Sequence, residues 1–187
     1  MDITTAQFSK HFKALADQFA RKSDLQALVQ HCSLSLVPAG TRIIAYGGVC
    51  STLYLVWSGL LSASIEDDEV KLVLGDVGPG EWVGEVTMIE PGPATASVTC
   101  IEDSYLLALS HEVFDKLRAS HPAAAGALLR ALCLNMTERL RASSDRITEQ
   151  IGNGEYRLRD MPPAEKASAV GLITALLGIL LGIRKGE

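Results

Sequence analysis

The sequence is short of aromatic residues and of positive charge. Aromatics make up 5% of its 187 residues, and 17 Lys and Arg stand against 22 Asp and Glu, a net charge of −5. A protein that binds nucleic acid through its surface charge needs an excess of cations, so this balance argues against that class. With 48% hydrophobic and 21% charged residues, the chain is also too apolar to be disordered.

The cysteines and histidines show none of the motif spacings that are typical of a metal or catalytic site. The four cysteines lie 18, 50 and 33 positions apart without a C-x-x-C pair, so we expect reduced thiols and neither zinc nor a redox dithiol. No histidine falls between positions 32 and 110, where a cupin-type enzyme would place its metal ligands. His111-Glu112 is not H-E-x-x-H, because Asp115 stands at the final ligand position. We therefore expect no enzyme, no metal and no resident cofactor.

Targeting signals are missing from the start of the chain. The first residues lack the basic start and apolar run of a signal peptide, and Lys10 and Lys13 interrupt the next segment, so we expect a cytoplasmic protein. At ~150 residues per domain, the length predicts one domain at 1–151. A linker at 152–165 and an apolar helical tail at 166–187 would come after it.

At the start of the expected domain, residues 4–31 have the apolar spacing of helices. One expected helix covers 4–20, and its apolar face carries Phe8, Phe12, Leu15 and Phe19. A second expected helix covers 24–31, and Ser23 would cap it through a capping box with Gln26.

A β-rich region and two more helices complete the domain. Residues 35–109 hold about seven short β-rich runs at roughly ten-residue spacing, which predicts a small barrel or sandwich. Residues 111–151 return to helical texture, with a short helix opened by His111 and a long one at 123–151. The sequence thus predicts an α+β fold, a mainly-β jelly-roll-like barrel flanked by N-terminal helices and a long C-terminal helix.

Apolar residues at near-heptad spacing run along the expected long helix. They are Leu129, Leu132, Met136 and Leu140. Such a seam on a helix that projects from a small barrel predicts a helix contact between two copies of the chain. The alternative is that this face packs on the chain's own barrel.

The tail is apolar and carries a stripe of small residues. Residues 167–183 are 17 positions without a charge. As a helix they would be about 26 Å long, which is near the lower limit for crossing the hydrocarbon core of a bilayer. The stripe is made by Ser168, Gly171, Ala175, Gly178 and Gly182, and it includes a G-x-x-x-G helix-pairing motif. It predicts that residues 166–185 attach the chain to a membrane or a protein partner. Packing within an oligomer or on the barrel, and a disordered or processed tail, are the alternatives.

Two stretches carry a resemblance to a known family. The first, GGVCSTLYLVWSG at 47–59, is a glycine turn, a small residue, a hydrophobic strand and a closing glycine. The second is VGEVTM at 83–88, followed after five residues by ATASVTC at 94–100. In order and register they resemble the cyclic-nucleotide-binding domain of catabolite-activator-type regulators, kinase regulatory subunits and gated channels. The likeness covers roughly residues 5–150.

The resemblance implies a ligand-binding cassette. Its residues here are Gly84, Glu85, Val86, Ala94 and Thr95. In that family a short helix points backbone N–H groups at the cyclic phosphate, and a glutamate, here Glu85, accepts a hydrogen bond from the ribose 2′-hydroxyl. An arginine pairs with the phosphate, and the next residue touches the base or the phosphate. Thr95 fits that last role, but Ala94 stands in place of the arginine.

The expected barrel has almost no cation to replace the arginine. Between Ile43 and Ser110 one cation, Lys71, stands against ten acids, a net charge of −9. A lost charge-assisted partner and a negative field both weaken the binding of an anion. We therefore expect impaired binding of cAMP or cGMP.

These observations leave two interpretations. The one we favour is a non-catalytic regulatory or sensor module with a degenerate cassette. It would act as an oligomerising scaffold that is attached through its tail, and the inner face of a membrane is one place where the tail could attach. The alternative is a functional receptor for cAMP, cGMP or another small ligand that signals through the long helix. We expect no nucleic-acid partner, because 36 residues after Ile151 are too few for the winged-helix domain of catabolite-activator-type regulators.

Overall fold

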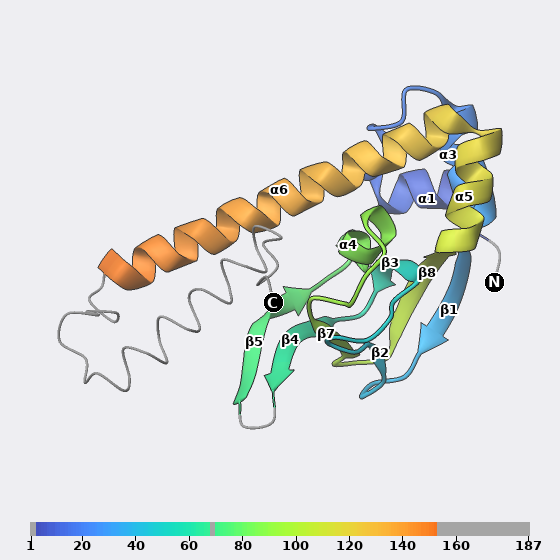
Figure 1. Ribbon diagram of the computed structural model, residues 1–187. Coiled ribbons are helices and arrows are strands. Elements are labelled where there is room, and N and C mark those ends of the chain that lie inside the picture. The colour runs from blue at the N-terminus through green and yellow to red at the C-terminus, as the bar shows by residue number, and fades with distance from the viewer. Residues whose placement is uncertain (1–2, 68–69, 153–187) are drawn as a thin grey trace, which may run out of the picture. The chain divides into compact units, whose positions relative to one another are not determined.

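The computed structural model of the chain describes residues 3–67 and 70–152 (Figure 1). The chain divides into two compact units, Met1–Asn135 and Met136–Glu187. The first unit holds the helices and strands described below, up to the first part of the long helix. Of the second unit, the structure describes the remainder of that helix.

Three short helices open the first unit. They are α1 (Thr5–His11), α2 (Lys13–Ala16) and α3 (Lys22–His31). A capping box between Thr4 and Gln7 starts α1. The single helix predicted at 4–20 is wrong, because Phe12 (φ −124°, ψ 67°) leaves the helical region and separates α1 from α2.

The predicted cap of the next helix is also wrong. α3 begins two residues earlier than expected, with Arg21 at its N-cap and no side-chain cap bond. The Arg21 guanidinium instead donates to Asp24 of the first turn, with N–O distances of 2.9 and 3.0 Å. A carboxylate in the first turn also interacts favourably with the helix dipole.

Within residues 3–67 and 70–152, eight strands form two antiparallel four-stranded sheets. The strands are β1 (Ser33–Val37), β2 (Arg42–Ile44), β3 (Thr52–Ser58), β4 (Leu61–Asp67), β5 (Val70–Val77), β6 (Trp82–Val83), β7 (Ser97–Cys100) and β8 (Ser104–Ser110). The first sheet has the order β1-β8-β3-β6 and the second β2-β7-β4-β5. The predicted α+β, jelly-roll-like fold is confirmed, as two facing sheets rather than a closed barrel. The strands span two residues more at the start, and one more at the end, than the predicted 35–109.

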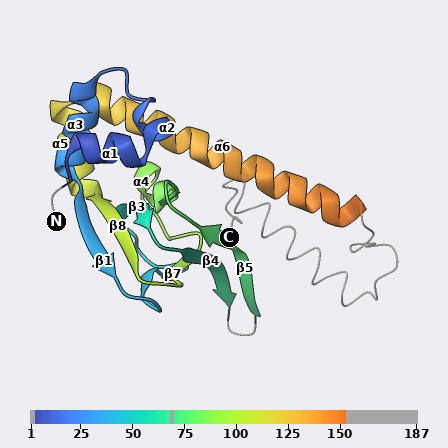
Figure 2. The same cartoon turned by 180° about the vertical axis from the view of Figure 1, so that it is seen from behind.

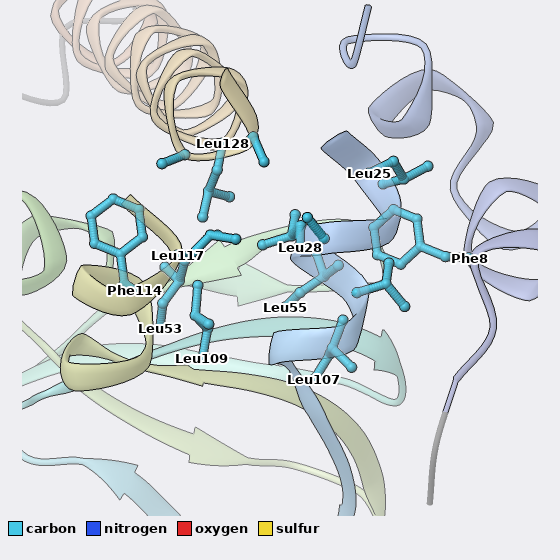
Figure 3. Packing of buried hydrophobic residues seen from close by; sticks show 14 of the residues in the cluster. Phe8, Leu25, Leu28, Leu53, Leu55, Leu107, Leu109, Phe114, Leu117 and Leu128 are labelled. Atoms are coloured by element: carbon cyan, nitrogen blue, oxygen red, sulfur yellow. The ribbon is translucent and has the colours of Figure 1, made fainter. Parts of the chain in front are cut away.

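The first sheet separates two apolar cores. The helix-side core joins strand residues such as Leu53, Leu55 and Leu107 to helix residues such as Phe8 and Leu28 (Figure 3). The inter-sheet core lies between the two sheets and consists of Ile44, Val56, Leu61, Val77, Val83, Ala94, Val98, Cys100 and Leu106. Alternation of side chains along a strand explains the division, since neighbouring residues of β8 point to opposite cores.

In the part of the chain that the structure describes, two helices come after the strands, as predicted. α5 (His111–Ser120) is capped by the Ser110 hydroxyl, and α6 (Pro122–Gly152) has 31 residues. α3 and α5 lie side by side at one end of the first unit in both views (Figures 1 and 2). Their apolar faces supply much of the helix-side core.

The residues of the predicted dimer seam belong to different units of the structure. Leu132 is fully buried in the helix-side core of its own unit, and Leu129 packs on that core, so the intermolecular role predicted for Leu132 is wrong. Met136 and Leu140 belong to the second unit, where Leu140 is 40% exposed. For these two residues the seam stays a prediction.

The tail at 166–187, with Gly171, Ala175, Gly178 and Gly182, lies outside the described residues, as does most of the linker predicted at 152–165. Among the helices at 3–67 and 70–152, none is long and apolar enough to cross a membrane.

Candidate functional site

A left-handed glycine starts the predicted cassette. β6 pairs with β3 and places Val83 opposite Tyr54. The chain then turns at Gly84, whose φ of +85° favours glycine. A Cβ atom at this position would lie 2.5 Å from the carbonyl oxygen of Thr52, so a side chain would collide with the backbone of β3.

A short helix begins after the glycine. α4 (Glu85–Ile89) lies beside β3 (Figure 1). The Gly84 carbonyl accepts from the Met88 N–H and from the Thr87 hydroxyl, both at 3.1 Å, which closes the turn. Glu85, at the first helical position, is buried at 8% exposure, whereas Val86 is half-buried. A buried carboxylate is the main polar group that α4 contributes.

Ala94 lies in an apolar setting. It is 5% exposed and belongs to the inter-sheet core. Its N–H donates to the carbonyl of Gly48, and its carbonyl accepts from the N–H of Gly47, both at 2.8 Å. These two bonds fix the backbone at the position where the family's arginine would stand. The Ala94 N–H is engaged in the bond to the Gly48 carbonyl.

The loop at 47–52 connects the two halves of the cassette. Gly47 and Gly48 hold Ala94, while Thr52 and the Cys50 sulfur approach Gly84. The structure therefore brings the predicted site residues into one local assembly, with Thr95 half-buried next to Ala94. Sequence reasoning identified the glycine turn as part of the family pattern but did not assign it this clamping role, which depends on carbonyl positions.

The groups around the site are largely uncharged. Burial raises the pKa of the Tyr54 hydroxyl and of the Cys100 thiol, so both are neutral near pH 7. Strand register places Lys71 opposite Glu66 on the β4–β5 hairpin, next to its turn. Arg42 lies at the exposed start of β2, in register with Thr99. Within the cassette itself, Glu85 is the buried ionisable residue.

The comparison with known proteins agrees with this geometry. The family description "Cyclic nucleotide-binding domain" matches residues 34–121, a range that contains nearly all of both sheets and α4. The chain carries a cyclic nucleotide-binding domain. The resemblance on the two glycine-containing stretches is therefore confirmed, and the domain is regulatory in kind.

Individual relatives show how far the likeness extends. The cyclic AMP receptor protein of Thermus thermophilus is 35% identical over 106 residues, 55% of this chain and 48% of that protein. The crystal structure of the catabolite activator protein of the same organism has a TM-score of 0.57 at 27% identity, covering 69% of this chain and 59% of that one. A cyclic nucleotide-binding domain from Methylobacillus flagellatus has a TM-score of 0.70 at 20% identity, over 79% and 86% of the two chains, and shows the fold alone.

The chain spans about half the length of the receptor protein from Thermus. A fungal protein named lysophospholipase nte1, from Aspergillus fumigatus, is 32% identical over 105 residues, but these are 7% of that protein. The likeness is therefore to a domain that occurs in proteins of different overall organisation.

Proposed function

We propose that this chain is a non-catalytic regulatory module of the cyclic nucleotide-binding family whose cassette does not hold a cyclic phosphate through an ion pair. One observation carries the proposal: Ala94, at the arginine position, is buried in the inter-sheet core with its N–H bonded to Gly48. A methyl group offers neither charge nor hydrogen bond to a phosphate oxygen.

The expected loss of affinity is large. A hydrogen bond to a charged group contributes about 1.5–3 kcal/mol, which corresponds to roughly 10- to 150-fold in binding. The barrel's surplus of nine negative charges between Ile43 and Ser110 adds a repulsive field. Ordinary cAMP or cGMP affinity is therefore not expected.

The module would act as a scaffold. Leu140 on α6 is 40% exposed and would pair with a second copy of the chain, together with Met136. The apolar segment at 166–185 would attach the assembly to a membrane or to a protein partner.

A second candidate is a working receptor for cAMP or cGMP. Two observations favour it: Gly84 keeps the left-handed conformation that starts the cassette, and Glu85 is buried at its expected place. This receptor would transmit binding through α6 as a shift between two conformational states.

Calorimetric titration with cAMP, cGMP and cyclic dinucleotides, up to millimolar concentration, tests the proposal. We expect no dissociation constant in the micromolar range for any of them. A micromolar value for cAMP or cGMP would favour the receptor instead.

Restoring the missing cation is the companion experiment. Ala94→Arg should gain about 10-fold or more in cAMP affinity, because it supplies the charge-assisted partner. Ala45→Arg adds the same charge at an exposed position near the same turn and should gain much less. Equal gains in the two variants would mean that the general field, and not the local contact, limits binding.

A further inference from the structure

We infer that His31 and His121 together bind one divalent transition-metal ion of the Zn²⁺ type, on elements separate from the cassette. The two imidazole rings lie 6.1 Å apart between centroids, at an interplanar angle of 65°. At Zn–N distances of about 2.0–2.1 Å, two imidazoles that share one ion have ring centres roughly 5–6 Å apart. The observed spacing is just above that range, so the side chains need to move little to share an ion. Motif spacing could not reveal this pair, because its residues are 90 positions apart.

The hydrogen bond of His31 determines which ring nitrogen can bind a metal. His31 Nδ1 lies 2.7 Å from the carbonyl oxygen of Ala27. A carbonyl only accepts, so Nδ1 carries the hydrogen and Nε2 keeps its lone pair in the neutral ring. Among the described residues, this is the hydrogen bond that the His31 ring makes. Nε2 is therefore the nitrogen that can act as a ligand.

His121 has the same tautomer, for a reason that lies two groups away. Its Nδ1 is 2.9 Å from the Ser120 hydroxyl oxygen, and that hydroxyl donates to the Lys116 carbonyl at 2.7 Å. Because the hydroxyl has a single proton, it accepts from the His121 Nδ1–H, and Nε2 again keeps its lone pair. Metal-binding histidines in proteins almost always donate their other ring N–H to such an acceptor. Both rings are thus prepared to bind a cation through Nε2.

The helix ends around the pair also favour a cation. His31 is the last residue of α3, and His121 is the C-cap of α5. The carbonyl end of a helix carries a partial negative charge, which stabilises a positive group close by. The start of α6 at Pro122 has the opposite effect, so two favourable helix ends act against one unfavourable end.

The two elements that carry the histidines are held by core packing. α3 and α5 lie side by side (Figures 1 and 2). Leu28 of α3 and Leu117 of α5 are both buried in the helix-side core (Figure 3). Ligands on packed helices keep their spacing without the ion, which lowers the cost of binding. His31 is half-buried and His121 is exposed, so an ion can reach the pair from solvent.

The ligand set selects the kind of ion. In the part of the chain that the structure describes, no group of three His, Cys, Asp or Glu residues could hold a metal. Two imidazoles would therefore bind the ion, and water would complete its coordination. Imidazole nitrogen suits Zn²⁺, Ni²⁺ and Cu²⁺, whereas Mg²⁺ and Ca²⁺ prefer oxygen ligands. An ion at this place would link the end of α3 to the junction of α5 and α6.

Calorimetric titration of the untagged full chain with ZnCl₂, in a reducing buffer, tests the inference. We expect one ion per chain. His31→Gln and His121→Gln should each weaken binding by about 10-fold or more, because even loss of a ligand's hydrogen-bond partner costs about 10–100-fold. His111→Gln is the matched control, since His111 lies on α5 with its Nε2 3.7 Å from Asp115, and should leave affinity unchanged. Cys133→Ala, which removes an exposed thiol, should also leave it unchanged.

Ser120 tests how His121 is positioned. Ser120→Ala removes the acceptor of the Nδ1–H bond and should weaken Zn²⁺ binding about 10-fold. Ser120→Thr keeps the hydroxyl and should keep the affinity. Circular dichroism checks that all variants fold. If His31→Gln does not fold, His121→Gln at the exposed C-cap of α5 still tests the pair.

Thermal unfolding distinguishes one shared ion from two independent sites. Zn²⁺ at about 100 times its dissociation constant should raise the unfolding midpoint by roughly 5–10 °C, and each histidine variant should lose this shift. An ion on a single imidazole would bind the unfolded chain equally and leave the midpoint unchanged. No binding at millimolar Zn²⁺, two ions per chain, or a shift that survives both variants would overturn the inference. None of these outcomes bears on the cassette, so the proposed function has its own separate test.

Discussion

Gly84 shows how one residue determines the start of the cassette. It combines a φ of +85° with a Cβ position 2.5 Å from the Thr52 carbonyl oxygen. The left-handed conformation costs an ordinary residue about 1–2 kcal/mol, and the collision would push β3 and α4 apart. Burial alone would not reveal this constraint, because Gly84 is only half-buried.

We therefore expect Gly84→Ala to lower the free energy of unfolding by about 2–4 kcal/mol. Gly47→Ala is the matched control, because Gly47 has a φ of +70° but nothing within 4 Å of its Cβ position. It should cost about 1–2 kcal/mol. Urea unfolding of both variants measures the difference. Equal losses would show that the contact with Thr52 contributes nothing.

Cys32 gives a second prediction at the scale of a residue. Burial raises the pKa of its thiol from 9.0 to about 12. Above pH 9 the unfolded chain loses this proton while the folded chain keeps it, so the stability present below pH 9 declines as pH rises toward 12. The slope should be up to about 1.4 kcal/mol per pH unit.

The measurement is urea unfolding at pH 8 and at pH 10. Cys32→Ala should flatten the decline between these values, and Cys133→Ala, at an exposed position of α6, should not. Cys100 and Tyr54, whose pKa values burial also raises, would maintain a smaller decline in both variants. An unchanged slope in Cys32→Ala would contradict the prediction.

At the scale of elements, the N-terminal helices show what the sequence could predict. The spacing of Phe8, Phe12 and Phe19 correctly indicated the buried positions, since all three lie in the helix-side core. The break at Phe12 was missed because its cause is tertiary. Phe12 packs edge-on against Trp57, with 5.3 Å between the ring centroids. Its ring also lies beside Gly80, 3.6 Å from the position that a Cβ atom would occupy there. No local propensity encodes those contacts.

α6 is the element for which pattern and structure diverge most. A heptad pattern cannot distinguish an intrachain core from an intermolecular seam, because both require apolar residues on one face. Leu132 packs in the core of its own chain, whereas Leu140 is exposed.

We expect Leu140→Glu to convert a dimer of the full chain to monomer, because it places a charge in the predicted seam. Arg130→Glu, at an exposed position of the same helix, should leave the dimer intact. Size-exclusion chromatography with light scattering measures the mass. A monomeric parent chain, or a dimer that survives Leu140→Glu, would mean that α6 does not carry the contact.

At the scale of the whole molecule, the fold was more predictable than the backbone contacts that hold the site together. Strand spacing and glycine turns specify a two-sheet fold, because each strand has its own local pattern. The shortage of cations around the cassette was also visible in the sequence. The clamp between Ala94 and Gly47-Gly48 was not, because hydrogen bonds between backbone groups 46 to 47 positions apart depend on the folded register.

The tail provides a prediction for the complete chain. In vesicle flotation, the full chain should move with the lipid, and a chain ending at Asp160 should stay behind, because it lacks the apolar segment at 167–183. Leu180→Arg in the full chain serves as a point-substitution test and should weaken flotation. If the full chain stays with the buffer as a monodisperse species, membrane attachment is wrong and a protein partner remains.

Of the chain's two tryptophans, Trp82 adjoins the cassette and Trp57 lies against the N-terminal helices. Trp82, 2% exposed, stands two residues before Gly84, and Trp57 stacks on His11 at 4.4 Å between ring centroids while its carbonyl bonds the imidazole at 2.7 Å. Indole emission responds to such neighbours. Trp82, two residues before Gly84, thus gives the protein an intrinsic optical probe, and fluorescence titration can test occupancy of the cassette without an attached dye.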